Sequence, residues 1–83
     1  MRLRNGMRAY VLVRVKTGLE RETLQAFQDI ASLEEIDFLF GEYDYILTLQ
    51  AQDTATLARL ITTRIRQAPG VIHTTTLLEA PLS

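Results

Sequence analysis

The residues best suited to bind a small molecule lie in two short stretches of the chain. Asp44 lies three residues after Gly41. Its carboxylate could accept charge-assisted hydrogen bonds from an ammonium group. The same carboxylate could instead cap backbone N–H groups of the turn. Gly41 could let a ligand approach the backbone closely, or it could serve only as a turn glycine. A run of threonines at residues 74–76 offers hydroxyls for a ligand carboxylate, although threonine is also a common strand former.

Catalytic and metal-binding chemistry has few side chains available. The 83 residues contain no cysteine and one histidine, His73, which leaves no set of ligands for a zinc site or a thiol nucleophile. Tyr10, Asp44 and His73 are the only acid–base groups that an enzyme site could combine, and their spacing specifies nothing. His73 could sense pH, but a lone strand histidine is more often a surface or interface residue. We therefore expect no enzyme activity, no cofactor and no metal.

Length and charge narrow the class of protein further. A chain of 83 residues forms one domain, and 47% hydrophobic residues exceed what so small a core can cover. Nine basic against ten acidic residues give a net charge of −1, which argues against a free-standing nucleic-acid binder. Residues 1–7 form a basic arm without the apolar region of a signal peptide, and no apolar run could span a bilayer. We predict a cytoplasmic protein without a membrane contact.

Four segments alternate apolar and polar residues with the period of a β-strand. They cover residues 8–16, 34–40, 43–51 and 71–78. The apolar face of the first segment consists of Ala9, Val11, Val13 and Val15. Because only Gly41 and its neighbour separate the second and third segments, these two strands must form an antiparallel hairpin.

Two amphipathic helices lie between these strands. Thr17 and Glu20 fit a capping box at the start of the first helix, which ends near residue 31 or 32. Asp53 is a good N-cap for the second helix, which stops before Pro69. We expect the arginines of the second helix, at positions 59, 64 and 66, on its solvent side.

The resulting order, βαββαβ, predicts an α+β fold of the ferredoxin-like type. In this fold both helices cover one face of a four-stranded antiparallel sheet. The other face carries Tyr10 and Leu12 and is left uncovered. Such an apolar face is too large to leave in water, so we expect a homodimer of the dimeric α/β-barrel type, built on the sheet face or its edges.

Three motifs within this order of elements resemble a known family. They are Gly41-Glu42-Tyr43-Asp44 between the second and third strands, Pro69-Gly70-Val71 before the last strand, and Thr74-Thr75-Thr76 inside it. With them the chain resembles the stand-alone effector domain, called RAM, of the Lrp/AsnC feast/famine regulators. The resemblance extends over residues 8–79, between the arm of residues 1–7 and a tail of residues 80–83.

The resemblance implies a regulatory module that binds a small effector, commonly an amino acid, between dimers that assemble into a ring such as an octamer or decamer. It assigns ligand-binding roles to Gly41, Tyr43 and Asp44, and to Thr74, Thr75 and Thr76. Full-length members carry a helix-turn-helix domain, whereas only seven residues precede the first strand here. We therefore expect no direct nucleic-acid binding, and an output through full-length regulators as partners.

Two other classes of protein have the same order of elements. One is a small dimeric α/β-barrel enzyme, such as a monooxygenase or isomerase, which would need placed acid–base groups. The other is an ACT-like amino-acid-binding domain, which differs in its assembly. The Gly-x-Tyr-Asp hairpin favours the RAM domain over the ACT-like domain.

Overall fold

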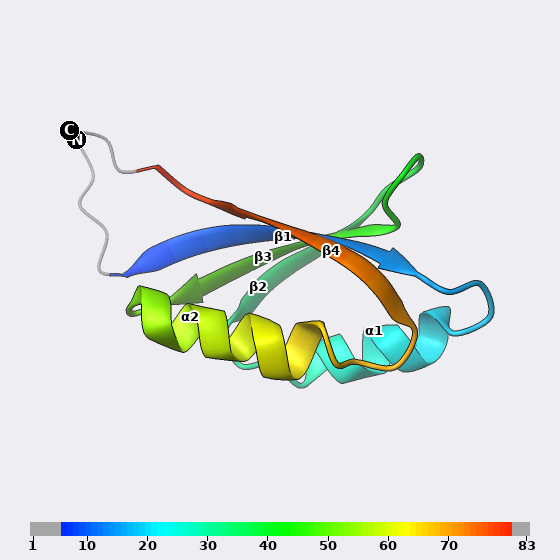
Figure 1. Ribbon diagram of the computed structural model, residues 1–83, viewed down its shortest axis with the longest axis horizontal. Helices are drawn as coiled ribbons and strands as arrows, with labels where there is room; N and C mark the ends of the chain where they lie inside the picture. The colour runs from blue at the N-terminus through cyan, green and yellow to red at the C-terminus, as the bar shows by residue number, and fades with distance from the viewer. Residues whose placement is uncertain (1–5, 81–83) are drawn as a thin grey trace.

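The computed structural model describes residues 6–80 and contains the elements in the predicted order (Figure 1). The strands are β1 (Met7–Val15), β2 (Leu33–Phe38), β3 (Tyr45–Ala51) and β4 (Val71–Leu78). The helices are α1 (Glu20–Gln28) and α2 (Thr54–Leu60), and α2 continues directly into the π-helical turn η1 (Ile61–Ile65). The predicted N-terminal arm, apart from its last two residues, and the end of the tail lie outside the described residues.

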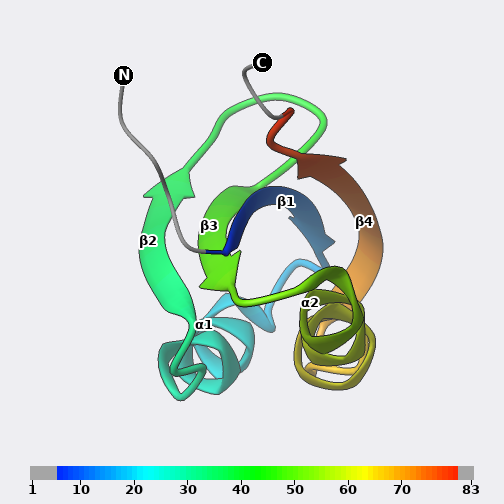
Figure 2. The ribbon, with the colours of Figure 1, turned by 90° about the vertical axis from the view of Figure 1, so that its left-hand side faces the viewer.

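The four strands form one antiparallel sheet in the order β2-β3-β1-β4. Figure 2 shows the sheet curling over the two helices, which lie on the same face of it. The predicted ferredoxin-like arrangement is therefore confirmed, with β2 and β4 as the two edge strands. Within the described residues no helix is long and apolar enough to cross a membrane.

The core lies between the helices and the two inner strands. The predicted apolar face of β1 is buried, and it is matched across the β1–β3 ladder by buried residues such as Leu47 and Leu49. Phe27 of α1 packs its ring edge against Tyr45, with ring centroids 6.3 Å apart and an interplanar angle of 83°. The period-two burial of β1 and β3 follows from the alternation of side chains along a strand. The second helix closes the core with Leu57, Ile61 and Ile65.

The predicted capping box at the start of α1 is wrong. The N-cap position is Leu19, which makes no side-chain cap, and the helix begins only at Glu20. Gly18 takes a left-handed φ of +96° and turns the chain sharply before the helix. The Glu20 carboxylate accepts a hydrogen bond from the backbone N–H of Gly18 at 2.9 Å. It therefore stabilises the turn before the helix and does not cap the helix.

The hairpin between β2 and β3 is longer than predicted. β2 ends two residues before its predicted end and β3 begins two residues after its predicted start, so residues 39–44 form a loop in which Phe40 is fully exposed. The Leu39 N–H donates to the Asp44 carbonyl at 2.8 Å, and the Asp44 N–H donates to the Val13 carbonyl at 2.9 Å. This second bond draws the chain away from β2 toward the end of β1, which ends the β2–β3 ladder.

Asp53 caps α2 as predicted, and this contact gives a pH-dependent prediction. Its Oδ1 accepts the Thr56 N–H at 2.7 Å, and hydrogen bonds from Thr56 lower the pKa of the Asp53 carboxyl below its ordinary value of 3.8. A carboxyl whose pKa is depressed by folding stabilises the protein above its unfolded-state pKa, and this contribution is lost as the pH falls through the folded-state pKa. We expect D53A to melt below the wild type at pH 7, and the gap between the two melting temperatures to narrow as the pH falls below 3.8.

D53N is the matched control for this experiment, because an asparagine side chain still accepts the capping bond without the charge. We expect D53N to melt between the wild type and D53A at pH 7, and its melting temperature to change less with pH than that of the wild type. A gap between the wild type and D53A that stays constant down to acid pH would contradict the assigned role of the carboxylate. Thermal unfolding followed by circular dichroism measures all three proteins.

Candidate functional site

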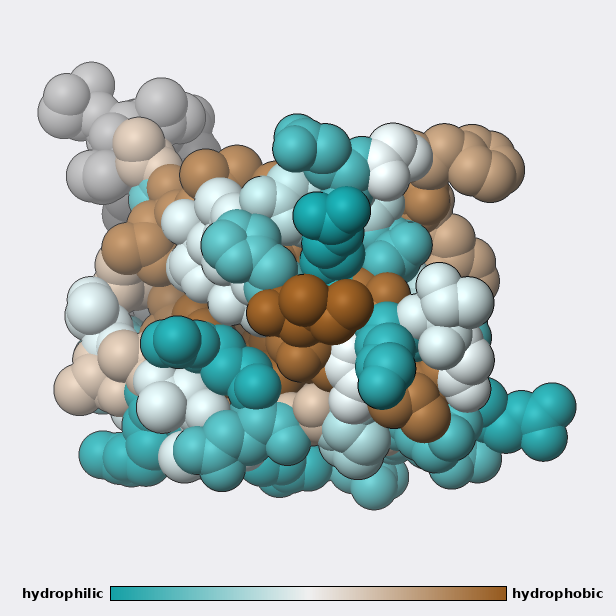
Figure 3. Space-filling model, turned by 45° about the vertical axis from the view of Figure 1, so that its right-hand side comes forward, coloured by the Kyte–Doolittle hydropathy of each residue, from teal (hydrophilic) through white to brown (hydrophobic). Residues whose placement is uncertain are grey.

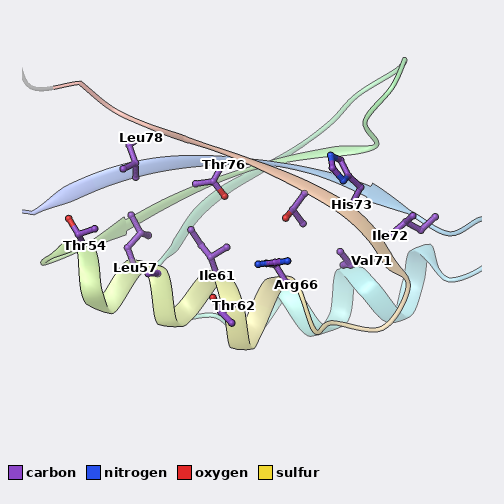
Figure 4. A pocket seen from close by; sticks show the side chains of 12 residues that line it. Thr54, Leu57, Ile61, Thr62, Arg66, Val71, Ile72, His73, Thr76 and Leu78 are labelled. Carbon is purple, nitrogen blue, oxygen red and sulfur yellow. The ribbon is translucent and has the colours of Figure 1, made fainter.

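Two hollows flank the edge strand β4, one on each face of the sheet. The larger, about 730 Å³, lies between β4 and the α2–η1 helix (Figure 4). The smaller, about 370 Å³, lies on the open face beside the hairpin loop. Ile72 and His73 line both hollows. The start of β4 is thus accessible from both sides.

The larger hollow, which we call the α2–β4 cleft, has an apolar floor and a hydroxyl-bearing wall. Three residues of β4 lie opposite buried residues of β1, so their side chains are on the helix side of the sheet. They are Thr74, Thr76 and Leu78. The helix packs against β1 and β3, while β4 curls away from it (Figure 2). This separation leaves the cleft. It is lined by Thr54, Leu57, Ala58, Ile61, Thr62, Arg66, Val71, Ile72, His73, Thr74, Thr76 and Leu78.

The π-turn η1 brings Arg66 to this cleft. The Arg66 N–H donates to the Ile61 carbonyl at 2.8 Å, five residues back, whereas an α-helical bond would span four. Arg66 therefore follows Ile61 on the cleft wall, and Figure 4 shows its side chain rising from the helix toward β4. The sequence predicts Arg66 on the solvent side. It is indeed exposed, but it also lines the cleft.

The smaller hollow contains one of the predicted site residues, Tyr43. Its hydroxyl lies 2.7 Å from Thr75 Oγ1, and its ring stacks on His73 with centroids 6.1 Å apart and an interplanar angle of 26°. Arg14 and Glu42 supply one cation and one anion at the rim. These contacts join the hairpin loop to β4 across the end of β1.

Asp44 ties the same loop to β1. Its Oδ2 accepts the Val15 N–H at 2.7 Å, beside the point where the β1–β4 register shifts. The carboxylate thereby satisfies a backbone donor that the irregular ladder leaves unpaired. This is the structural role that the sequence allows for Asp44, and its ligand-binding role stays a prediction.

Gly41 lies in the loop with a left-handed φ of +114°. A methyl group at this position would meet no atom within 4 Å, so the turn conformation alone explains the glycine. Gly41, Asp44 and Thr75 line neither hollow, whereas Thr74 and Thr76 line the cleft. The structure therefore divides the six predicted site residues between the cleft, the open face and the loop.

The three acid–base groups that the sequence offers, Tyr10, Asp44 and His73, do not line one common hollow. Tyr10 pairs with Leu77 and His73 pairs with Arg14, so the two side chains lie four positions apart along the sheet. Asp44 is engaged with the Val15 N–H. Within residues 6–80, no three histidine or carboxylate side chains gather as metal ligands.

An apolar patch stays open to solvent on the side of the molecule shown in Figure 3, framed by hydrophilic side chains. On β4, Ile72 is 61% exposed, and Leu77 and Leu78 are each about half exposed, on opposite faces of the sheet. Exposed apolar surface of this kind is typical of a binding or assembly site.

The fold and the cleft are those of a small α+β domain of ferredoxin-like topology. Residues 8–79 match the family model described as the Lrp/AsnC ligand binding domain, and the chain belongs to this family. The resemblance inferred from the hairpin and strand motifs is thereby confirmed. A search of curated protein sequences finds no significant match.

Solved structures share the fold over nearly the whole chain. FFRP-DM1 is 27% identical, with a TM-score of 0.84 over 89% of this chain and 99% of its own. TTHA0845 from Thermus thermophilus is 25% identical, with a TM-score of 0.84 over 93% of this chain and 96% of its own. The transcriptional regulator NMB0573 from Neisseria meningitidis, solved with L-Met, is 15% identical with a TM-score of 0.85, and the match covers 93% of this chain and 51% of that protein.

Proposed function

We propose that the chain is a regulatory module that binds a small effector, an amino acid or a similar metabolite, in the α2–β4 cleft. The observation that carries this proposal is the cleft itself, about 730 Å³ in volume, with an apolar floor and threonine hydroxyls along one wall. Small-molecule sites in proteins have this size and this composition. Membership of the Lrp/AsnC ligand-binding family and the L-Met complex of the Neisseria regulator support it. The module binds and releases its ligand without a catalytic step.

Within this proposal the predicted site residues act from two directions. The hydroxyls of Thr74 and Thr76 face the ligand directly from the cleft wall. The hydroxyls of Tyr43 and Thr75 are hydrogen-bonded to each other on the opposite face of the sheet, and this bond holds β4 in position. Gly41 and Asp44, in the hairpin loop, line neither hollow, and we propose that they contact the effector from a neighbouring subunit.

We further propose that the module works as a homodimer or a larger ring. Tyr10 and Leu12 lie on the open face of β1, and Ile46 of β3 and Leu77 of β4 extend the same face. A second copy that covers this face would produce the dimeric α/β-barrel assembly. The effector would act through its different affinities for the assembly states, or for full-length regulators bound as partners.

A thermal-shift screen tests the proposed effector site. We expect at least one of the twenty amino acids, at millimolar concentration, to raise the melting temperature, because ligand binding stabilises the folded state as RT ln(1 + [L]/Kd). T76V replaces a cleft hydroxyl by a methyl group of similar size and should weaken the effect. T63V is the matched control, since the exposed Thr63 hydroxyl donates to the Arg59 carbonyl and does not line the cleft. A screen without any shift in the wild type would overturn the proposed function.

A further inference from the structure

We propose that the α2–β4 cleft selects its ligand by a carboxylate and an apolar chain, with Arg66 binding the carboxylate. The amino group of an amino acid then contributes little to affinity, so simple carboxylic acids with the same chain are ligands too. This inference rests on the proposed effector site and names the chemical class that the site takes. Three observations carry it: the charges that line the cleft, the position of Arg66, and the exposed apolar lining.

The cleft is lined by basic but not by acidic side chains. Among its described lining residues none is an aspartate or glutamate, and Arg66 is the basic side chain that faces into it, because the His73 ring stacks on Tyr43 on the opposite face of the sheet. Asp53, at the start of α2, is already engaged in capping the helix through Thr56. An ammonium group placed in the cleft would lose water without gaining a carboxylate partner, which is unfavourable. A carboxylate, in contrast, meets a guanidinium.

Arg66 is positioned to receive that carboxylate. The η1 turn aligns it with Ile61, so that its side chain reaches across the cleft toward β4 (Figure 4). Among residues 6–80 no ion pair engages Arg66. A guanidinium can bind both oxygens of a carboxylate through two parallel hydrogen bonds. The nearby carbonyls at the helix C-terminus repel an anion, so Arg66 is the group that makes binding of a carboxylate favourable here.

The apolar lining gives the ligand a direction. From Arg66 the helix wall continues through Ile61 and Leu57, and Leu78 faces them from β4 (Figure 4). Leu78 is about half exposed, so a bound chain would remove apolar surface from water. A ligand with its carboxylate at Arg66 therefore lays its hydrocarbon chain toward Leu57 and Leu78. Each added methylene should tighten binding by roughly fourfold until the cleft is filled.

Three compounds that share a 3-methylbutyl chain separate the two polar groups. L-leucine carries both, 4-methylpentanoate lacks the amino group, and 3-methylbutylamine lacks the carboxylate. Titration calorimetry of the full chain should give dissociation constants within about threefold for leucine and 4-methylpentanoate, and at least about tenfold weaker binding for the amine. Straight-chain acids from butanoate to octanoate should show the rise of affinity with length.

Two arginines of one helix supply matched variants. R66Q should weaken binding of 4-methylpentanoate by about tenfold or more, and R66K, which keeps the charge without the bidentate geometry, should fall between. R64Q removes the same charge from the exposed Arg64, which does not line the cleft, and should bind like the wild type. Circular dichroism confirms that each variant is folded.

The outcomes distinguish this inference from the proposed function. If leucine binds and 4-methylpentanoate does not, the amino group is recognised and the inference fails, while the effector site stands. If R66Q binds the acids as tightly as R64Q, the role of Arg66 is refuted. If no amino acid and no carboxylic acid binds, the proposed function itself fails.

Discussion

Replacing Gly70 with alanine is expected to lower the free energy of unfolding by about 3 kcal/mol, the sum of a conformational and a steric cost. Gly70 has a φ of +83°, a conformation that costs an L-residue roughly 1–2 kcal/mol. A methyl group there would also lie 2.6 Å from Thr23 Oγ1 and 2.8 Å from Leu19 Cβ. Thr23 is fully buried and its hydroxyl donates to the Leu19 carbonyl, so neither neighbour can move cheaply. Overpacking of this kind adds roughly 1–3 kcal/mol.

The loss is large for a chain of this size. Small domains have total stabilities near the lower end of about 5–15 kcal/mol, so G70A should melt about 15 °C below the wild type. The Gly70 carbonyl also accepts the Lys16 N–H at 2.7 Å, and this bond joins the end of β1 to the start of β4. The substitution therefore disturbs the junction of α1, β1 and β4 as well as the turn.

Gly18 provides the control for this prediction. Its φ of +96° imposes a similar conformational cost, but a methyl group there would meet nothing within 4 Å. G18A should therefore lose only about 1 kcal/mol. Urea unfolding of the three proteins measures both differences. Equal losses in G18A and G70A would show that steric contact with Thr23 and Leu19 contributes nothing.

The strands could be predicted from the sequence because their signal is local. The alternation of residues 9–15 and 45–51 assigns each side chain to one face, and burial follows it. The alternation also continues to Phe40, where it misleads. Phe38 is the last β2 residue, and Phe40 is exposed because the Asp44 N–H bonds to Val13, a contact between distant parts of the chain. Long-range bonds of this kind leave no periodic trace in the sequence.

The candidate site could be predicted only in part. The sequence indicates the run of threonines on the last strand, and Thr74 and Thr76 line the cleft. It does not indicate Arg66, because the place of this residue depends on one extra residue in the turn η1, and the residues around it fit a regular α-helix equally well. The cleft itself exists because β4 curls away from α2, which is a property of the whole sheet.

Replacing Leu12 with glutamate is expected to break the proposed dimer while leaving the chain folded. Leu12 lies at the middle of the open face, where it pairs with Ile46 on one side and Thr75 on the other. A carboxylate at this position remains hydrated in the separate chain. In a face-to-face dimer it would be buried without a partner, at a cost of several kcal/mol per charge. The dissociation constant should therefore rise about a thousandfold or more.

Light scattering on the eluting peak measures this directly. The wild type should have at least twice the 9.4 kDa mass of one chain, and L12E should return the mass of one chain. Q25E adds the same charge to the exposed surface of α1 and should keep the wild-type mass. The Leu12 side chain contributes little to the core, so circular dichroism should show L12E folded. A wild type of 9.4 kDa, or an L12E variant that keeps the larger mass, would show that this face is not the interface between copies.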